Sequence, residues 1–337
     1  MIKQETMKRN SFGKIGDFIM EYLVLFAILA LIIITAIVEP RFLSAQNLTN
    51  LMRQFGPLSF VALGMTFVIL GGFIDLSIPG MISLIAMVTL GLVDGVGILP
   101  AVGEVPALIL GLMFGTLLGV INGTILVVMG ANTQAKALFI TFGMSQIYRS
   151  IALQYTGGFP MNWGQLFDNP MIVTRQLASG TVGPISYSFI MFLFFLIVLF
   201  IFQTKTVQGR SITYTGGNIV AANLGGIPVK RTMIFIYGLC GFMVAIGSIV
   251  LFSRVAVTVP GIGDFFERDA ILSVVVGGTS LVGGRGSVLR TFMGVTLVIL
   301  LSNCLNLLDV QSHAQEVVRG AVLVVAIWLD HRRHAKG

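Results

Sequence analysis

The chain has 337 residues, of which 55% are hydrophobic and 10% are charged, and its formal net charge is +7. Soluble domains carry roughly 25% charged residues, so this composition excludes an ordinary soluble fold. The basic residues are spread over several loops rather than gathered on one face, which argues against a nucleic-acid partner.

Ten hydrophobic segments follow one another along the chain, and we interpret them as membrane-spanning helices. A helix needs roughly 20 apolar residues to cross the hydrocarbon core, and most of the uncharged runs approach or exceed that length. We therefore predict an all-α, polytopic membrane bundle of about ten transmembrane helices in two five-helix halves. The runs are 22–38, 54–74, 76–93, 105–135, 176–204, 232–253, 270–284 and 291–308, with two shorter candidates at 137–148 and 320–329.

The loops divide the chain into one membrane domain and two short polar ends. Residues 1–17 are expected to form a cytoplasmic N-terminal tail, 18–331 the transmembrane domain and 332–337 a cytoplasmic C-terminal tail. The longest inner loop is 203–231 and the longest outer loop is 155–186. One long loop on each side of the membrane predicts a contact surface for a partner on each side.

The distribution of basic residues predicts the orientation. If the first span leaves the cytoplasm, 14 of the 21 basic residues fall on the inner side. Cytoplasmic loops carry an excess of lysine and arginine, so this arrangement is favoured over its inverse. An even number of spans then places both termini in the cytoplasm.

The sequence contains no recognisable energy source or catalytic cluster. No phosphate-binding loop of the G-x-x-x-x-G-K-[ST] type occurs, and His313, His331 and His334 lack the spacing of metal ligands. Carboxylates deep in the bundle, which a proton or sodium relay needs, are almost absent. We therefore expect a transport protein rather than an enzyme, with no metal or cofactor in this chain and energy supplied by a separate subunit.

One carboxylate, Asp75, stands between two uncharged membrane-length runs. A charge at the centre of a membrane helix costs roughly 2.5 to 3.5 kcal/mol, so this residue belongs at a membrane edge or in a polar pathway. We expect it near the inner boundary, where it caps the following helix through backbone N–H groups or contacts a solute. Farther along, Gly115 and Gly119 form a small-residue face suited to close helix packing.

Five motifs, in this order, resemble the permease subunits of ATP-binding-cassette importers for monosaccharides. These are the ribose and galactose type within the sugar and branched-chain amino acid permease superfamily, and the resemblance covers about residues 40–330. The motifs are GGFIDLS from Gly71, Asn122-Gly123, TGGFP from Thr156, Gly209-Arg210 followed by GGN from Gly216, and VVVGGTSL from Val274 followed by GGRGS from Gly283.

The resemblance implies a complex of several chains in the bacterial cytoplasmic (inner) membrane. The permease pairs with a second copy or a homologous permease, and cytoplasmic ABC ATPase subunits bind ATP and magnesium. An extracytoplasmic sugar-binding protein delivers the solute. Transport by alternating access is the implied activity.

The resemblance also suggests residues for two sites. The substrate pathway is assigned to Asp75, Ser77, Asn122, Phe139, Thr141, Asn303 and Asn306. The two asparagines of the ninth span could bind sugar hydroxyls or could equally bond other helices. Contact with the ATPase is assigned to Gly216, Gly217, Asn218, Ala221, Ala222, Leu224 and Gly226.

Two departures from the family pattern weaken parts of this assignment. The fifth span opens with Ala135 and Lys136 where the family has a proline kink, which puts the usual sugar path there in doubt. Ile219 and Val220 replace acidic residues, so apolar packing must carry more of the ATPase contact. A permease for nucleosides or branched-chain amino acids, and a gradient-driven secondary transporter or channel, stay open as alternatives.

Overall fold

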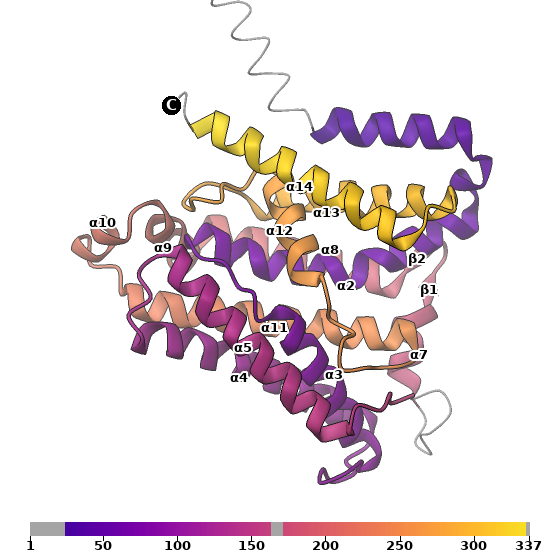
Figure 1. Cartoon of the computed structure of the whole chain (residues 1–337), viewed down its shortest axis with the longest axis horizontal. Helices are drawn as coiled ribbons and strands as arrows, with labels where there is room; N and C mark the ends of the chain where they lie inside the picture. The colour runs from indigo at the N-terminus through magenta and orange to yellow at the C-terminus, as the bar shows by residue number, and fades with distance from the viewer. Residues whose placement is uncertain (1–23, 163–170, 335–337) are drawn as a thin grey trace, which may run out of the picture.

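The computed structural model describes residues 24–162 and 171–334, and most of this part of the chain is helical (Figure 1). The predicted tail 1–17 lies outside the described residues. The elements are a helix at Val24–Val38, η1 (Pro40–Leu43), α2 (Ala45–Leu70), α3 (Ile78–Asp94), α4 (Glu104–Val128), α5 (Gln134–Thr156), α7 (Ile172–Ser179), β1 (Thr181–Val182), β2 (Ile185–Ser186), α8 (Tyr187–Lys205), α9 (Val207–Gly217), α10 (Ile219–Leu224), α11 (Val229–Val255), α12 (Phe266–Val276), α13 (Val288–Leu307) and α14 (Ser312–His334).

Each of the ten predicted spans coincides with a helix. Five of the described helices, α2, α4, α8, α11 and α13, are long and apolar enough to cross a membrane. The helix at Val24–Val38 and α3 are shorter apolar helices, and α5, α12 and α14 account for the rest. The protein is an all-α polytopic membrane bundle; β1 and β2 form a small antiparallel hairpin between α7 and α8.

Several predicted spans have different limits in the structure, and the second and the eighth show why. The second begins at Ala45 rather than near residue 54, because the hydroxyl of Ser44 accepts the backbone N–H of Asn47 and starts one continuous helix. The eighth, predicted to continue to residue 284, ends at Val276. Several glycines that follow adopt positive φ, which ends the helix and turns the chain back into the bundle.

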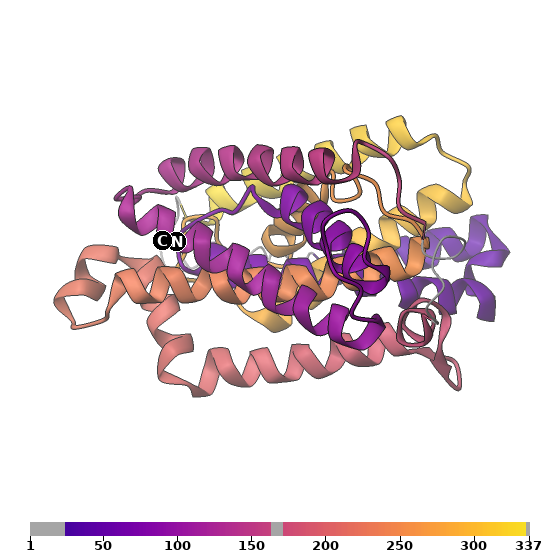
Figure 2. The same cartoon turned by 90° about the horizontal axis from the view of Figure 1, so that it is seen from below.

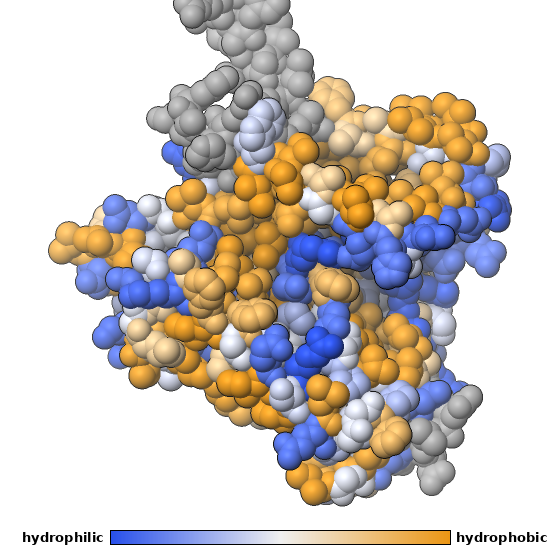
Figure 3. Space-filling model, viewed as in Figure 1, coloured by the Kyte–Doolittle hydropathy of each residue, from blue (hydrophilic) through white to orange (hydrophobic). Residues whose placement is uncertain are grey.

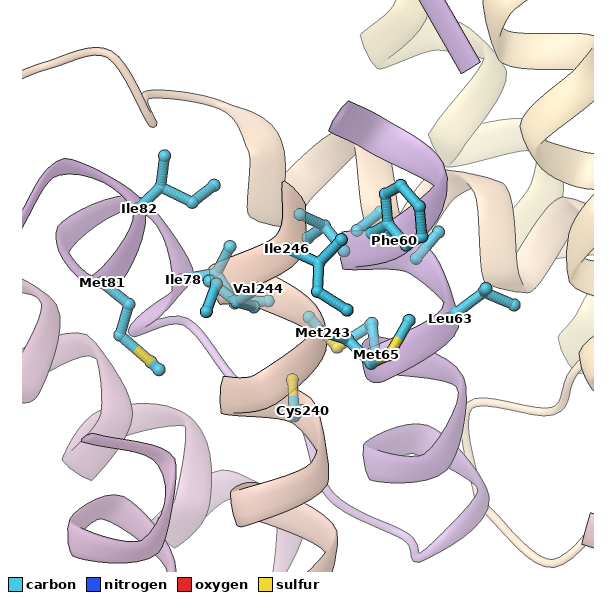
Figure 4. Packing of buried hydrophobic residues seen from close by; sticks show 14 of the residues in the cluster. Phe60, Leu63, Met65, Ile78, Met81, Ile82, Cys240, Met243, Val244 and Ile246 are labelled. Carbon is cyan, nitrogen blue, oxygen red and sulfur yellow. The ribbon is translucent and has the colours of Figure 1, made fainter. Parts of the chain in front are cut away.

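The centre of the bundle is formed by α2 and α11. Most residues of both helices are buried, as expected of helices that are apolar around their whole circumference. Figure 4 shows Met65 of α2 beside Met243 of α11, with Phe60 and Ile246 nearby. Viewed from below, α5 and α14 lie along one long side of the molecule and α8 along the opposite side (Figure 2).

The predicted small-residue face of α4 packs directly on α11. A Cβ atom added at Gly119 would overlap the carbonyl oxygen of Tyr237, and one added at Gly241 would overlap that of Gly115. Glycines on both helices therefore let the two backbones touch, which is how membrane helices gain van der Waals contact without a hydrophobic driving force. The structure confirms the packing role predicted for Gly115 and Gly119.

Candidate functional site

Asp75 lies in a non-helical segment, residues 73–77, that joins α2 to α3 inside the bundle. Its side chain is buried, and Oδ1 accepts hydrogen bonds from the backbone N–H of Ser77 at 2.8 Å and from the Ser77 hydroxyl at 2.5 Å. Ser77 is the residue that immediately precedes α3. The carboxylate thus fixes the residue before the helix, whereas a helix cap would accept N–H groups of the first turn.

A chain of hydrogen bonds extends from this carboxylate across three helices. The amide of Asn122 on α4 donates to the Ser77 hydroxyl at 2.7 Å, and the Tyr148 hydroxyl on α5 donates to Asn122 Oδ1 at 2.7 Å. All four side chains are buried. Each donor points toward the carboxylate, so one proton arrangement satisfies Tyr148, Asn122, Ser77 and Asp75 Oδ1 together, and we call these four residues the Asp75 network.

Side chains of neighbouring helices also bind the backbone of the non-helical segment. The hydroxyl of Thr141 accepts the N–H of Leu76 at 2.9 Å, and the hydroxyl of Tyr237 donates to the carbonyl of Ile74 at 3.2 Å. Buried backbone groups outside a helix need such partners in a membrane protein. The predicted residues Asp75, Ser77, Asn122 and Thr141 are therefore brought together.

Sequence reasoning missed Tyr148 and Tyr237. A signal for Tyr148 was available, because Thr141, Ser145 and Tyr148 share one face of α5 at helical spacing. The second oxygen of Asp75, Oδ2, is buried and has no hydrogen-bond partner among the described residues. It is a buried acceptor that a hydroxyl donor would stabilise.

The remaining predicted pathway residues lie apart from this network. Phe139 lies on the side of α5 that faces away from the bundle, and its side chain is 73% exposed. Asn303 exchanges two side-chain hydrogen bonds with Asn47 of α2, at 2.9 and 3.1 Å. Asn306 accepts a bond from Gln315 of α14 at 2.9 Å. Both asparagines thus bond neighbouring helices, which is the second of the two interpretations given above.

The loop 203–231 contains the end of α8, α9, α10 and the start of α11. Asn218 caps α10 by accepting the backbone N–H of Ala221 at 2.9 Å. Ala222 is buried and therefore packs inside the protein, whereas Leu224 is 83% exposed. Exposed positions of the predicted contact set are Gly217, Asn218, Ala221, Leu224 and Gly226.

Gly216 belongs to a contact between three backbones, formed by Gly72, Gly216, Gly217, Gly283 and Gly284, which we call the glycine junction. A Cβ atom added at Gly216 would overlap the carbonyl oxygen of Leu70, and one added at Gly283 would lie 2.7 Å from the Cα of Gly72. The N–H of Gly284 donates to the Leu70 carbonyl at 2.9 Å. The end of α9 therefore touches both the turn that leads to Asp75 and the loop after α12.

A groove of about 710 Å³ lies beside the junction, between α9 and α10. Its lining includes Arg210, Tyr214, Ala221, Ile227 and Gly284. Tyr214 and Leu224 are largely exposed aromatic and aliphatic side chains at this end of the molecule. Such exposed apolar residues around a hollow are typical of a protein contact surface.

Near the middle of the bundle, partly buried charged side chains bind α12, α13 and α14 to one another (Figure 1). Arg268 pairs with Glu316 at 2.5 Å, and Arg319 pairs with Asp269 at 2.9 Å while donating to the Ser302 hydroxyl at 3.0 Å. No role for these arginines was predicted from the sequence. On the face of the molecule seen in Figure 1, hydrophilic residues gather between α14 and α5 (Figure 3).

Comparison with known proteins agrees with this architecture. The family model described as "Branched-chain amino acid transport system / permease component" matches residues 47–327. Ribose import permease proteins RbsC of Haemophilus influenzae and Bacillus subtilis are 34% and 36% identical, each alignment covering 98% of both chains. The xylose transport system permease protein XylH of Escherichia coli is 30% identical over 92% of this chain and 91% of its own. No solved structure matches the chain.

The fold is a multi-pass membrane bundle that encloses the Asp75 network, and the comparisons identify its class as a permease. By the match over most of its length, the chain belongs to the family of branched-chain amino acid transport system permease components.

Proposed function

We propose that this chain is the membrane-spanning subunit of an ATP-driven importer for a small sugar. The observation that carries the proposal is the glycine junction, where the end of α9 touches the turn leading into the Asp75 network. The similar permeases are named for ribose and xylose, which supports a monosaccharide as the solute.

The partners follow from the two ends of the molecule. The exposed surface of α9 and α10 receives the cytoplasmic ATPase, which binds ATP and magnesium, and both termini lie on that same cytoplasmic side of the bacterial inner membrane. A sugar-binding protein docks at the opposite end, on the loop that carries α7 and the β1–β2 hairpin. Because apolar residues dominate the exposed side chains of α9 and α10, the ATPase contact depends mainly on packing.

A second copy, or a homologous permease, covers the face between α5 and α14. Gln146, Ser150 and Gln154 are exposed on α5 at intervals of one helical turn. Polar side chains on a span face a protein partner or water in preference to lipid. The space between two such faces therefore forms the polar path for the sugar.

Alternating access arises when ATP binding moves α9. Because no side chains separate the backbones at the glycine junction, a displacement of α9 is transmitted to residues 71–77 and 277–287 together. The Asp75 network then shifts relative to α4 and α5. During that shift Asp75 Oδ2 becomes accessible to a sugar hydroxyl, which it binds as an acceptor.

Uptake into proteoliposomes tests the solute class. The permease is reconstituted with the ATPase and binding protein encoded beside it, and radiolabelled ribose, xylose, a nucleoside and leucine are compared. We expect uptake of a pentose to be at least about tenfold above uptake of leucine. A tenfold preference corresponds to a difference of about 1.4 kcal/mol in binding free energy between the two solutes. Uptake of leucine or the nucleoside alone would assign the protein to the corresponding alternative.

A further inference from the structure

Two adjoining apolar grooves follow α4 on the surface of the bundle. The first, of about 480 Å³, lies between α4 and α11, and the second, of about 730 Å³, lies between α3 and α4. Thr116 and Val120 line both, so the two grooves adjoin along α4, and together we call them the channel. Their apolar lining is suited to acyl chains.

One end of the channel is positively charged. Arg231 is the only charged residue lining either groove, and Lys230 precedes it. Both lie in the first turn of α11, where the helix dipole adds positive charge, and that turn contains no acidic residue. Within the described part of the chain, neither side chain has an ion-pair partner.

We propose that this channel binds an anionic phospholipid of the cytoplasmic leaflet. An acyl chain lies against Val120 and the apolar side chains of α11, and the headgroup phosphate binds Arg231 and Lys230. Basic pockets between helices on the cytoplasmic side are suited to anionic headgroups, and each basic residue contributes about fivefold in affinity. The assignment to that leaflet rests on the orientation given under the proposed function.

The grooves favour a lipid over a protein occupant. Their walls are apolar along α4 and α11, within the hydrocarbon region, where a cytoplasmic ATPase cannot reach. A zwitterionic lipid has the same acyl chains but carries no net charge to match the two cations. Selectivity for negative charge is therefore the property that the site predicts.

Native mass spectrometry of the full-length permease, released from nanodiscs of phosphatidylcholine with phosphatidylglycerol, measures the lipid retained. We expect phosphatidylglycerol to be retained in preference, and the double variant Lys230→Ala, Arg231→Ala to lose about 25-fold in affinity for it. Arg231→Lys keeps the charge and should retain binding. Thr116→Phe, which fills the channel where the grooves meet, should lower retention of both lipids.

Arg290→Ala is the matched control, because it removes one exposed charge from the inner end of α13, away from the channel. Equal losses in Arg290→Ala and Arg231→Ala, or no preference for phosphatidylglycerol in the unaltered protein, would overturn the proposal. Unchanged lipid retention with lost ATPase capture in the double variant would assign the two cations to the ATPase instead. None of these readouts depends on sugar uptake, so failure of the lipid site is separable from failure of the transport proposal.

Discussion

At the scale of single residues, the two oxygens of Asp75 have different surroundings. Oδ1 accepts two hydrogen bonds from Ser77, and Oδ2 has no partner among the described residues. Asparagine preserves an acceptor for Ser77, whereas alanine leaves the buried N–H and hydroxyl without one. The main structural role of the carboxylate is therefore to fix the segment before α3.

Asp75→Ala should destabilise the permease more than Asp75→Asn does. Loss of the acceptor for two buried donors costs about 1 to 3 kcal/mol, and the amide avoids most of that cost. The free energy of unfolding in SDS mixed-micelle titrations measures the difference. If both variants unfold at the same SDS fraction, the hydrogen bonds to Ser77 are not what Asp75 contributes to stability.

Tyr148→Phe tests the other end of the network. Removing the hydroxyl leaves Asn122 Oδ1 without its 2.7 Å donor, and the expected loss of unfolding free energy is about 0.5 to 2 kcal/mol. Tyr155→Phe is a control on the same helix, since its hydroxyl bonds the carbonyl of Val96 at the exposed end. A Tyr148→Phe protein as stable as the unaltered one would contradict the network.

Part of this site could be predicted from the sequence. Asp75 and Asn122 stand out because a polar side chain within an apolar membrane run is energetically costly and usually has a structural or functional partner. Their partners could not be identified, because which turn of α4 or α5 lies level with residue 75 depends on how the helices pack. Asn303 has the same chemistry as Asn122, yet it bonds Asn47 instead.

At the scale of elements, backbone contact requires glycine at some positions and not at others. Gly216 and Gly217 are adjacent at the end of α9, yet only a Cβ atom at Gly216 would overlap a neighbouring carbonyl; at Gly217 the nearest atom is 4.0 Å away. Alanine substitutions at these two neighbouring positions therefore test whether the backbone contact at the junction is needed.

Gly216→Ala should lower the amount of sugar taken up per ATP hydrolysed, whereas Gly217→Ala should leave that ratio unchanged because its Cβ meets no neighbouring backbone. The added methyl group separates α9 from Leu70, and overpacking of this kind costs about 1 to 3 kcal/mol. Sugar transported per ATP hydrolysed in proteoliposomes is the measurement. Equal ratios in the two variants would show that the junction does not transmit the movement of α9.

Gly119→Ala should lower the stability of the bundle by about 1 to 3 kcal/mol, because the new Cβ would push α4 away from α11. Gly320→Ala on α14 is the control, since no atom lies within 4 Å of the added group there. Unfolding titrations of the two proteins compare them. A Gly119→Ala protein that unfolds like the control would remove the close-packing argument.

The helices themselves were largely predictable, because hydrophobic runs of membrane length have one main interpretation. The ends of the helices were less predictable. The sequence from Ala270 carries no charge as far as residue 284, yet the helix stops at Val276, where the chain turns at glycines of positive φ. Hydrophobicity alone does not reveal such turns. For the same reason the contact between Gly72, Gly216 and Gly283 could not be predicted, although each lies in a motif that stood out.

At the scale of the whole molecule, we propose that the chain provides the path and the coupling surface while another protein provides the energy. Exposed apolar side chains surround a groove at α9 and α10, at one end of the bundle. Ion pairs join α12 to α14 near its middle. A gradient-driven transporter would need neither a separate ATPase nor a surface to receive it.

Leu224→Asp should weaken capture of the ATPase by the permease, because it places a charge on an 83% exposed apolar contact residue. Truncating or charging a central interface residue typically costs more than about 1 kcal/mol, or several-fold in affinity. Asn223→Asp, on the neighbouring exposed position, is the matched control for charge. Equal capture by all three proteins in a pull-down would exclude Leu224 from the contact.

The central claim is tested most directly by sugar uptake into proteoliposomes that contain the permease, the binding protein and either an active ATPase or one that cannot hydrolyse ATP. We predict that sugar accumulates only when the ATPase is active and ATP is supplied on the side of the membrane where the ATPase is bound. Imposed proton or sodium gradients should have no effect. Accumulation by the permease without a working ATPase, driven by such a gradient, would contradict the account.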